Sequence, residues 1–310
     1  MAPEALAAVP APASIPGAWW IGSYSSLSQG VRHEGAAIDH DARISMPEHD
    51  EQSAVAATAD DDILNFPRGP EAGNCMHAVF ERVDFTDPTT WPAAIAAALR
   101  EQPQGQLAEA DAANLPRMLS RMLDDVLATR LPADIALCEV PRARRLVELE
   151  FNMPAGHLTA GALASLLREF GYPVPALSFG VLEGYLRGFI DLIFEHGGRY
   201  YILDWKSNYL GQLPAAYAGP PVARAMSEHG YHLQYLLYTV ALHRYLEHRM
   251  PDYRYDDHIG GAIYLFVRGV RPGWTADGQA TGVHFDRPPR TLIERLSALF
   301  AAHEPLVEAA

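Results

Sequence analysis

Residues 189–206 read FIDLIFEHGGRYYILDWK, and this stretch decides the fold. Two apolar runs rich in Phe, Ile, Leu and Tyr flank the dipeptide Gly197-Gly198. Two glycines between apolar strands are typical of a two-residue β-hairpin loop, because such loops need positive φ angles. We therefore predict two antiparallel strands, at 184–195 and 199–205. Both of their faces are apolar, so we expect a central hairpin that is covered on both sides.

The turn also predicts which residues lie opposite each other. Counting outward from Gly197-Gly198 places Asp191 opposite Asp204, with their Cβ atoms roughly 4.5–5.5 Å apart. Two carboxylates in an apolar hairpin repel each other and are poorly solvated. The cost is removed if one carboxyl takes a proton or if a cation lies between them. A hard divalent cation such as Mg²⁺ suits the second case, because it needs only one or two carboxylates beside water and phosphate.

Lys206 lies two residues beyond Asp204, on the same face of the strand. It is the only lysine in the sequence, in which every other Lys or Arg position is arginine. A lysine is a compact charge that can align or deprotonate a water molecule, or offset charge that develops on a phosphate. We therefore predict Asp191, Asp204 and Lys206 as catalytic residues. The alternative is a structural ion pair between Lys206 and either aspartate.

The rest of the chain alternates helices with strands. The apolar spacing predicts helices at 73–83, 117–129, 159–170, 229–249 and 291–301, and further strands at 146–151 and 261–267. This order is typical of an α/β fold with a mixed central β-sheet flanked by helices. We divide the chain into a flexible leader at 1–18, a short ordered motif at 19–34, an acidic disordered loop at 35–62 and a folded domain at 63–310.

The composition limits the function classes. The formal net charge of −14 is unusual for a nucleic-acid-binding protein, but residues 35–62 contribute half of it with eight acids and one base. No apolar run approaches the roughly 20 residues of a membrane span. No basic residue precedes Arg32, so a secretory signal is not expected. Cys75 and Cys138 are too few for a disulfide framework or an iron–sulfur cluster, and they favour a cytoplasmic setting.

Several other polar residues have weaker claims from spacing alone. A lone histidine such as His77 is more often a core or surface residue than a ligand. Gln234 and Tyr238 share one face of the long helix, where the default interpretation is an exposed polar surface. The remaining candidates are Glu81, the strand pair Glu148 and Glu150, and a basic cluster of Arg142, Arg144 and Arg145, for which a solvated surface is the default.

With these residues in hand, the chain resembles the C-terminal nuclease domain of exodeoxyribonuclease V beta subunits, a branch of the PD-(D/E)XK nuclease group. The resemblance covers roughly residues 19–300 apart from the acidic loop. The stretches that carry it are residues 23–27 (SYSSL), 66–69 (FPRG), 73–81 (GNCMHAVFE), 188–194 (GFIDLIF), 198–208 (GRYYILDWKSN), 233–246 and 260–269 (GGAIYLFVRG).

The resemblance implies a restriction-endonuclease-like fold and a set of functional residues. It implies that His77, Asp191, Asp204 and the backbone carbonyl of Trp205 bind Mg²⁺, with Mn²⁺ as a possible substitute, and that Lys206 assists the attacking water. It places Gln234 and Tyr235 in the helix motif that follows the catalytic strands, where we expect them to contact nucleic acid. The implied substrate is DNA, expected as single-stranded ends. The implied partners are the other exodeoxyribonuclease V subunits, of the RecC and RecD type, and a RecA-type recombinase.

The chain departs from this family in one respect. The helicase portion that precedes the nuclease domain in the family is absent, and no P-loop is present, so ATP-driven processivity is not predicted. We expect either a fragment, a truncated product or a free-standing nuclease. Two other classes of function remain open: a catalytically silent nuclease fold that binds DNA or docks in a helicase complex, and a purely structural interaction domain.

Overall fold

The computed structural model describes residues 19–23, 27, 59–105 and 107–301. The expected leader at 1–18 and residues 35–58 of the expected acidic loop lie outside the described residues. The strands are β1 (Trp19–Gly22), β2 (Arg145–Thr159), β3 (Val181–His196), β4 (Arg199–Lys206), β5 (Ile259–Phe266), β6 (Thr275–Ala276), β7 (Gln279–Ala280) and β8 (Val283–Asp286). The α-helices are α2 (Pro70–Arg82), α3 (Trp91–Glu101), α4 (Glu109–Ala128), α5 (Ala160–Glu169), α6 (Gly219–Glu228), α7 (Tyr231–Arg249), α8 (Tyr255–His258) and α9 (Arg290–Ala301).

The predicted hairpin is confirmed as β3 and β4. Gly197 and Gly198 form its turn with φ angles of 59° and 77°. The antiparallel register runs from His196 opposite Arg199 to Leu192 opposite Leu203, as counted from the sequence. Asp191 and Asp204 are the next residues in this register, immediately beyond the last ladder pair.

β3 organises a mixed sheet that has six strands within the described residues. β2 pairs antiparallel with β3 over nearly its whole length. The other edge of β3 is shared, because β1 pairs in parallel with residues 183–186 and β4 pairs with residues 192–196. β5 then pairs in parallel with β4, and β8 antiparallel with β5. Asp191 therefore lies where this edge of β3 passes from one neighbour to the other.

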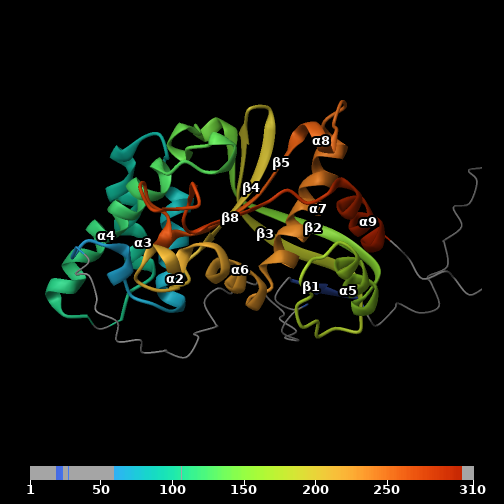
Figure 1. Ribbon diagram of the computed structural model, residues 1–310, viewed down its shortest axis with the longest axis horizontal. Coiled ribbons are helices and arrows are strands. Elements are labelled where there is room, and N and C mark those ends of the chain that lie inside the picture. The colour runs from blue at the N-terminus through green and yellow to red at the C-terminus, as the bar shows by residue number, and fades with distance from the viewer. Residues whose placement is uncertain (1–18, 24–26, 28–58, 106, 302–310) are drawn as a thin grey trace, which may run out of the picture.

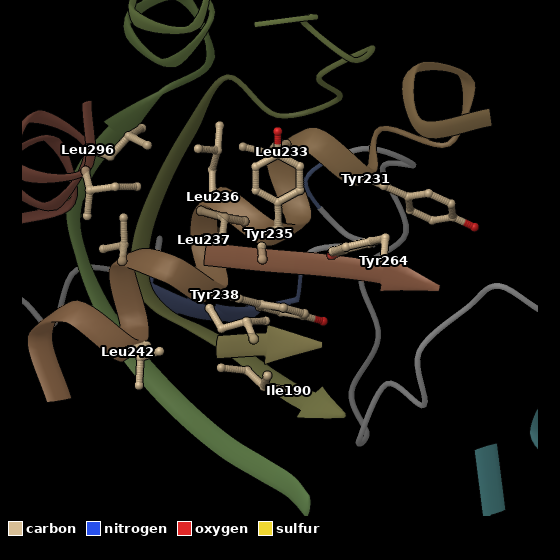
Figure 2. Packing of buried hydrophobic residues seen from close by; sticks show 14 of the residues in the cluster. Ile190, Tyr231, Leu233, Tyr235, Leu236, Leu237, Tyr238, Leu242, Tyr264 and Leu296 are labelled. Carbon is tan, nitrogen blue, oxygen red and sulfur yellow. The ribbon is translucent and has the colours of Figure 1, made fainter. Parts of the chain in front are cut away.

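Helices cover both faces of the sheet, as predicted for an α/β fold. Figure 1 shows α2, α3 and α4 gathered on one side and α5, α7 and α9 on the other. The first group packs in a core with Leu192, Phe194 and Leu203. The second packs in a core with Ile190 and Ile202, which also contains Leu236 and Leu237 of α7; Figure 2 shows part of this core. Burial of these apolar side chains removes them from water and supplies the main drive to fold.

Several predicted boundaries were wrong. β2 continues to Thr159 rather than 151 and contains Pro154; this is tolerated because β2 pairs with β3 alone among the described strands. α4 begins at Glu109 rather than at 117 and contains Pro116. The helices α3, α6 and α8 were not predicted. The expected α5 is confirmed, with Thr159 Oγ1 accepting a hydrogen bond from Ala162 N and Gly171 following at a φ of 76°.

The end of the expected acidic loop belongs to the folded body. Asp62 is buried and caps the 3₁₀ helix η2 (Ile63–Asn65) by accepting a hydrogen bond from Leu64 N. Its carboxylate also binds Arg271 through two contacts, at 2.7 and 3.1 Å. Residue 62 is therefore not part of a disordered segment. In the part of the chain that the structure describes, no helix is both long enough and apolar enough to cross a membrane.

Candidate active site

The candidate site lies between the two helical layers, at the end of the β3–β4 hairpin. β3 supplies Asp191 and β4 supplies Asp204 and Lys206, while α2 contributes His77 from one layer and α7 contributes Gln234 from the other. The apolar faces of the hairpin predicted that side chains on β4 would be buried. Asp204 and Lys206 have no solvent exposure, and Asp191 is 4% exposed.

Asp191 connects three elements of the fold. Its Oδ2 accepts a hydrogen bond of 2.9 Å from the backbone N–H of Trp205, so its carboxylate reaches across to β4. The same oxygen lies 3.4 Å from Nδ1 of His77 on α2. The β2–β3 ladder skips the opposing residue Glu148, whose φ is 50°. Neither the β2–β3 ladder nor the β3–β4 ladder includes Asp191. Its side-chain contacts therefore hold it in place.

Asp204 and Lys206 share one face of β4, as their spacing predicted. Lys206 Nζ lies 2.7 Å from Asp204 Oδ1. Trp205, between them, points to the opposite layer, where its ring stacks on Phe80 at 3.9 Å. The stack anchors this end of β4 to α2, the helix that carries His77.

A set of polar and aromatic groups surrounds the ammonium group of Lys206. Nζ donates a 3.2 Å hydrogen bond to Oε1 of Gln234 and lies 4.0 Å from the ring centroid of Tyr231. Gln234 Oε1 also accepts a bond from the Tyr264 hydroxyl, and Gln234 Nε2 donates to the Tyr238 hydroxyl, each at 3.0 Å. Figure 2 labels Tyr231, Tyr238 and Tyr264 in this core. The default interpretation of Gln234 and Tyr238 as exposed helix surface is therefore wrong, since both are buried.

Tyr235 follows Gln234 in the chain but makes different contacts. Its hydroxyl donates to Asp286 Oδ2 on β8 at 2.8 Å, and His232 Nδ1 lies 3.1 Å from it. Burial, and then the nearby Asp286 carboxylate, raise the pKa of the Tyr235 hydroxyl. Gln234 therefore contacts Lys206, whereas the hydroxyl of Tyr235 contacts Asp286 on β8.

The weaker candidates lie outside this group. Glu148 and Glu150 are exposed on β2, and Glu150 forms an ion pair with Arg187. In the basic cluster, Arg145 is buried on the ring of Phe85 and bonds the carbonyl of Val83, so it has a structural role. Glu81 is exposed on α2.

The donor chemistry of the site fits a hard divalent cation. Two buried carboxylates accompany one ammonium group, so their formal charges leave an excess of one negative charge beside the imidazole of His77. Carboxylate oxygens are the ligands that Mg²⁺ prefers, and Mg²⁺ needs few of them. Within the described residues no three His, Cys, Asp or Glu side chains are already gathered closely enough to hold a metal alone. Water and substrate oxygens would have to complete the coordination.

Comparisons with known proteins show which family the chain resembles. The profile of the PD-(D/E)XK nuclease superfamily matches residues 56–305. The RecBCD enzyme subunit RecB of Escherichia coli (strain K12) is 39% identical over 293 residues, which cover 91% of this chain and 23% of RecB. RecB of Haemophilus influenzae is 32% identical over 91% of this chain, and RecB of Mycolicibacterium smegmatis 34% identical over 98%. The chain spans about a quarter to a third of the length of these relatives, 23–31%.

Proposed function

Because the chain belongs to the PD-(D/E)XK nuclease superfamily, we propose that it is a Mg²⁺-dependent deoxyribonuclease that hydrolyses phosphodiester bonds. The observation that carries the proposal is the buried group at the end of the hairpin. Two carboxylates, Asp191 and Asp204, and the sole lysine of the chain, Lys206, meet there in a fold of the nuclease type. A structural core has no need of an unbalanced carboxylate, since burying one is costly.

In this proposal Asp191, Asp204, His77 and the backbone carbonyl of Trp205 hold the cation. When bound, Mg²⁺ polarises the scissile phosphate and lowers the pKa of a water molecule. His77 and the N–H of Trp205 fix the Asp191 carboxylate from two sides, at 3.4 and 2.9 Å, so that its second oxygen keeps a defined direction. Such support holds ligands in a productive geometry before the substrate arrives.

Lys206 holds the attacking water and offsets negative charge on the phosphate as the bond to the leaving oxygen breaks. Its position is set by Asp204 on one side and by Gln234 on the other. Because these groups exclude bulk water, the charge of the ammonium group acts at short range in a medium of low polarity, where it is most effective. Gln234 is therefore a positioning residue for Lys206.

On the basis of the similarity to RecB, we also propose a substrate and partner proteins. We assign DNA as substrate, with single-stranded ends expected, and a role of recombinational-repair type. The partners would be subunits of the RecC and RecD type in a helicase–nuclease complex, with a RecA-type recombinase acting downstream.

The direct contact of 2.7 Å between Lys206 and Asp204 favours a second candidate. If this ion pair is purely structural, the chain is a catalytically silent nuclease fold that binds DNA or docks in a larger complex. The two candidates differ in one measurable property, which is hydrolysis of DNA by the isolated chain in the presence of Mg²⁺.

The test is cleavage of labelled linear and circular single-stranded DNA, with Mg²⁺ and with EDTA. We expect cleavage only with Mg²⁺, and a fall of about 10²–10⁴-fold in rate for Lys206→Met, which keeps the length of the side chain but removes its charge. Circular dichroism of the variant checks that the fold survives. A wild-type chain that binds DNA without cutting it would favour the silent module, and an unaltered rate in Lys206→Met would refute the role of the lysine.

A further inference from the structure

Arg68, which is exposed, stacks on Tyr209, which is partly buried against the core. The guanidinium carbon of Arg68 lies 3.5 Å from the centroid of the Tyr209 ring, and the Arg68 side chain is exposed. A guanidinium that stacks through its face keeps its N–H groups directed outward in the plane, where they match a phosphate. Among the described residues, no carboxylate lies within ion-pair distance of Arg68, whereas Arg82, Arg121 and Arg130 each contact one.

Arg68 and Tyr209 are each close in the chain to a residue of the candidate active site. Tyr209 follows Lys206 by three residues, a distance of at most about 10 Å along an extended chain. Arg68 precedes α2, and the helical rise from Pro70 to His77 is also about 10 Å. A strand bound at the candidate site could therefore reach the pair within a few nucleotides.

A buried arginine fixes these two segments against each other. Arg268 is 1% exposed and donates to the backbone carbonyls of Phe66 at 3.0 Å and Pro67 at 2.5 Å, directly before Arg68. Its Nε donates to the carbonyl of Ser207 at 2.9 Å, directly after Lys206. Burial lowers the pKa of Arg268 to about 10, which leaves it cationic at neutral pH. The Arg68–Tyr209 pair is thus held at a set position relative to the catalytic strand.

Exposure indicates the side from which a substrate reaches the site. Asp204 and Lys206 are fully buried, Asp191 is 4% exposed, and the His77 side chain is 16% exposed. Of these side chains, that of His77 is the most exposed, so we take the route from solvent to run past α2, the helix that Arg68 precedes. An acidic chain with a formal charge of −14 needs local positive charge along that route to hold a polyanion.

From this geometry we infer that Arg68, stacked on Tyr209, is a binding site for a DNA phosphate a few nucleotides from the bond that is cut. The inference rests on the proposed function. Arg68 takes the phosphate through its in-plane N–H groups, and Tyr209 holds the guanidinium in the orientation that this contact needs. Both residues bind the strand, and neither takes part in hydrolysis.

The test measures binding separately from cleavage. Fluorescence anisotropy of a labelled single-stranded oligonucleotide is recorded with Ca²⁺ in place of Mg²⁺, for wild type, Arg68→Ala, Arg68→Lys and Tyr209→Leu. The matched control is Arg249→Ala, since Arg249 lies over the exposed ring of Tyr245 at the far end of α7. We expect Arg68→Ala to raise Kd by about tenfold and to reduce the slope of log K against log salt by about 0.7, the loss of one phosphate contact on a single strand.

The variants have distinct expected results. Arg68→Lys and Tyr209→Leu should show smaller rises in Kd, and Arg249→Ala none. With Mg²⁺, kcat/KM should fall with binding in Arg68→Ala while kcat at saturating DNA stays close to wild type. If Arg68→Ala binds as tightly as Arg249→Ala while the wild type cleaves DNA, the inference is overturned and the nuclease proposal stands. A wild-type chain that neither binds nor cleaves DNA overturns both.

Discussion

Two buried ion pairs of this protein have similar contact distances and different surroundings. Asp62 and Arg271 meet at 2.7 Å, as do Asp204 and Lys206, and all four residues are buried. The first pair joins the start of the folded body to the segment after β5. The second lies at the end of the β3–β4 hairpin.

The two pairs differ in how their charges are balanced. Asp62 meets the fork of Arg271 through both oxygens and also caps η2, so one negative and one positive charge are matched within the fold. Burial acts to raise the pKa of Asp62, but the hydrogen bonds from Arg271 and Leu64 outweigh it and the pKa is lowered. Lys206 instead shares its site with two carboxylates. A matched pair stabilises a structure, whereas an excess of buried carboxylate is an arrangement that a bound cation can stabilise.

The largest expected effect is on catalysis. Asp204→Asn keeps the shape of the side chain but removes a charge and a cation ligand, so Mg²⁺-dependent cleavage should fall by at least about 10³-fold. Asp62→Asn should leave the rate per folded molecule unchanged. Single-turnover cleavage of labelled DNA, corrected for the folded fraction, measures both. Equal losses in the two variants would remove the functional distinction between the pairs.

The second expected effect is on stability. Asp62→Ala leaves the Arg271 guanidinium buried without its counter-charge, which should lower the free energy of unfolding by about 3–5 kcal/mol. Replacement of both partners, Asp62→Leu with Arg271→Met, should cost less because no unpaired charge is left. Urea unfolding followed by circular dichroism gives both values. A double variant that is less stable than Asp62→Ala would contradict this explanation.

A third effect concerns His284, a half-buried ionisable group on β8. Burial, together with the neighbouring His232, lowers the pKa of His284 to about 4, despite the opposing effect of Asp286. In the unfolded chain the pKa is about 6.5, so the unfolded state binds more protons between these values and stability is lost as pH falls through this window. From pH 7 to pH 5 the loss should be about 1–2 kcal/mol. In His284→Gln the loss of unfolding free energy between pH 7 and pH 5 should be smaller, as measured by urea unfolding at both pH values. An equal loss in the wild type and the variant would contradict this role of His284.

The smallest expected effect concerns the support of Lys206. Gln234→Leu removes the acceptor of the Lys206 hydrogen bond while preserving volume, so the rate of cleavage should fall by about tenfold. Glu247→Leu, at an exposed position of the same helix, serves as the control and should keep the wild-type rate. Because a purely structural role would change stability alone, thermal unfolding is compared with kcat at saturating Mg²⁺. An unchanged kcat in Gln234→Leu would place Gln234 outside the mechanism.

Local patterns predicted much of the fold. The Gly197-Gly198 turn, the hairpin register, the capping of α5 by Thr159 and the mixed sheet were all predicted from the sequence and are confirmed. Helix α3 was missed, although Pro92 in its first turn and the buried spacing of Trp91, Ile95 and Ala98 carry its signal. The start of α4 was placed at 117, whereas the helix begins at Glu109 and contains Pro116.

The candidate site was predictable in part. Asp204 and Lys206 lie two residues apart on one strand, so their contact follows from the alternation of side chains. His77 was assigned to the site by family resemblance, and the structure places it 3.4 Å from Asp191. The partners of Gln234 were not predictable from helical spacing, because spacing identifies a shared face but not what covers that face.

The sequence by itself determined the hairpin, its register and the pairing of a lysine with an aspartate, because each depends on residues close together in the chain. Tertiary structure alone decided that Arg268 joins the segment at 66–67 to Ser207, and that Asp62 meets Arg271 across more than 200 residues. Such contacts depend on how layers pack. Packing is set by the summed burial of many side chains rather than by any local pattern.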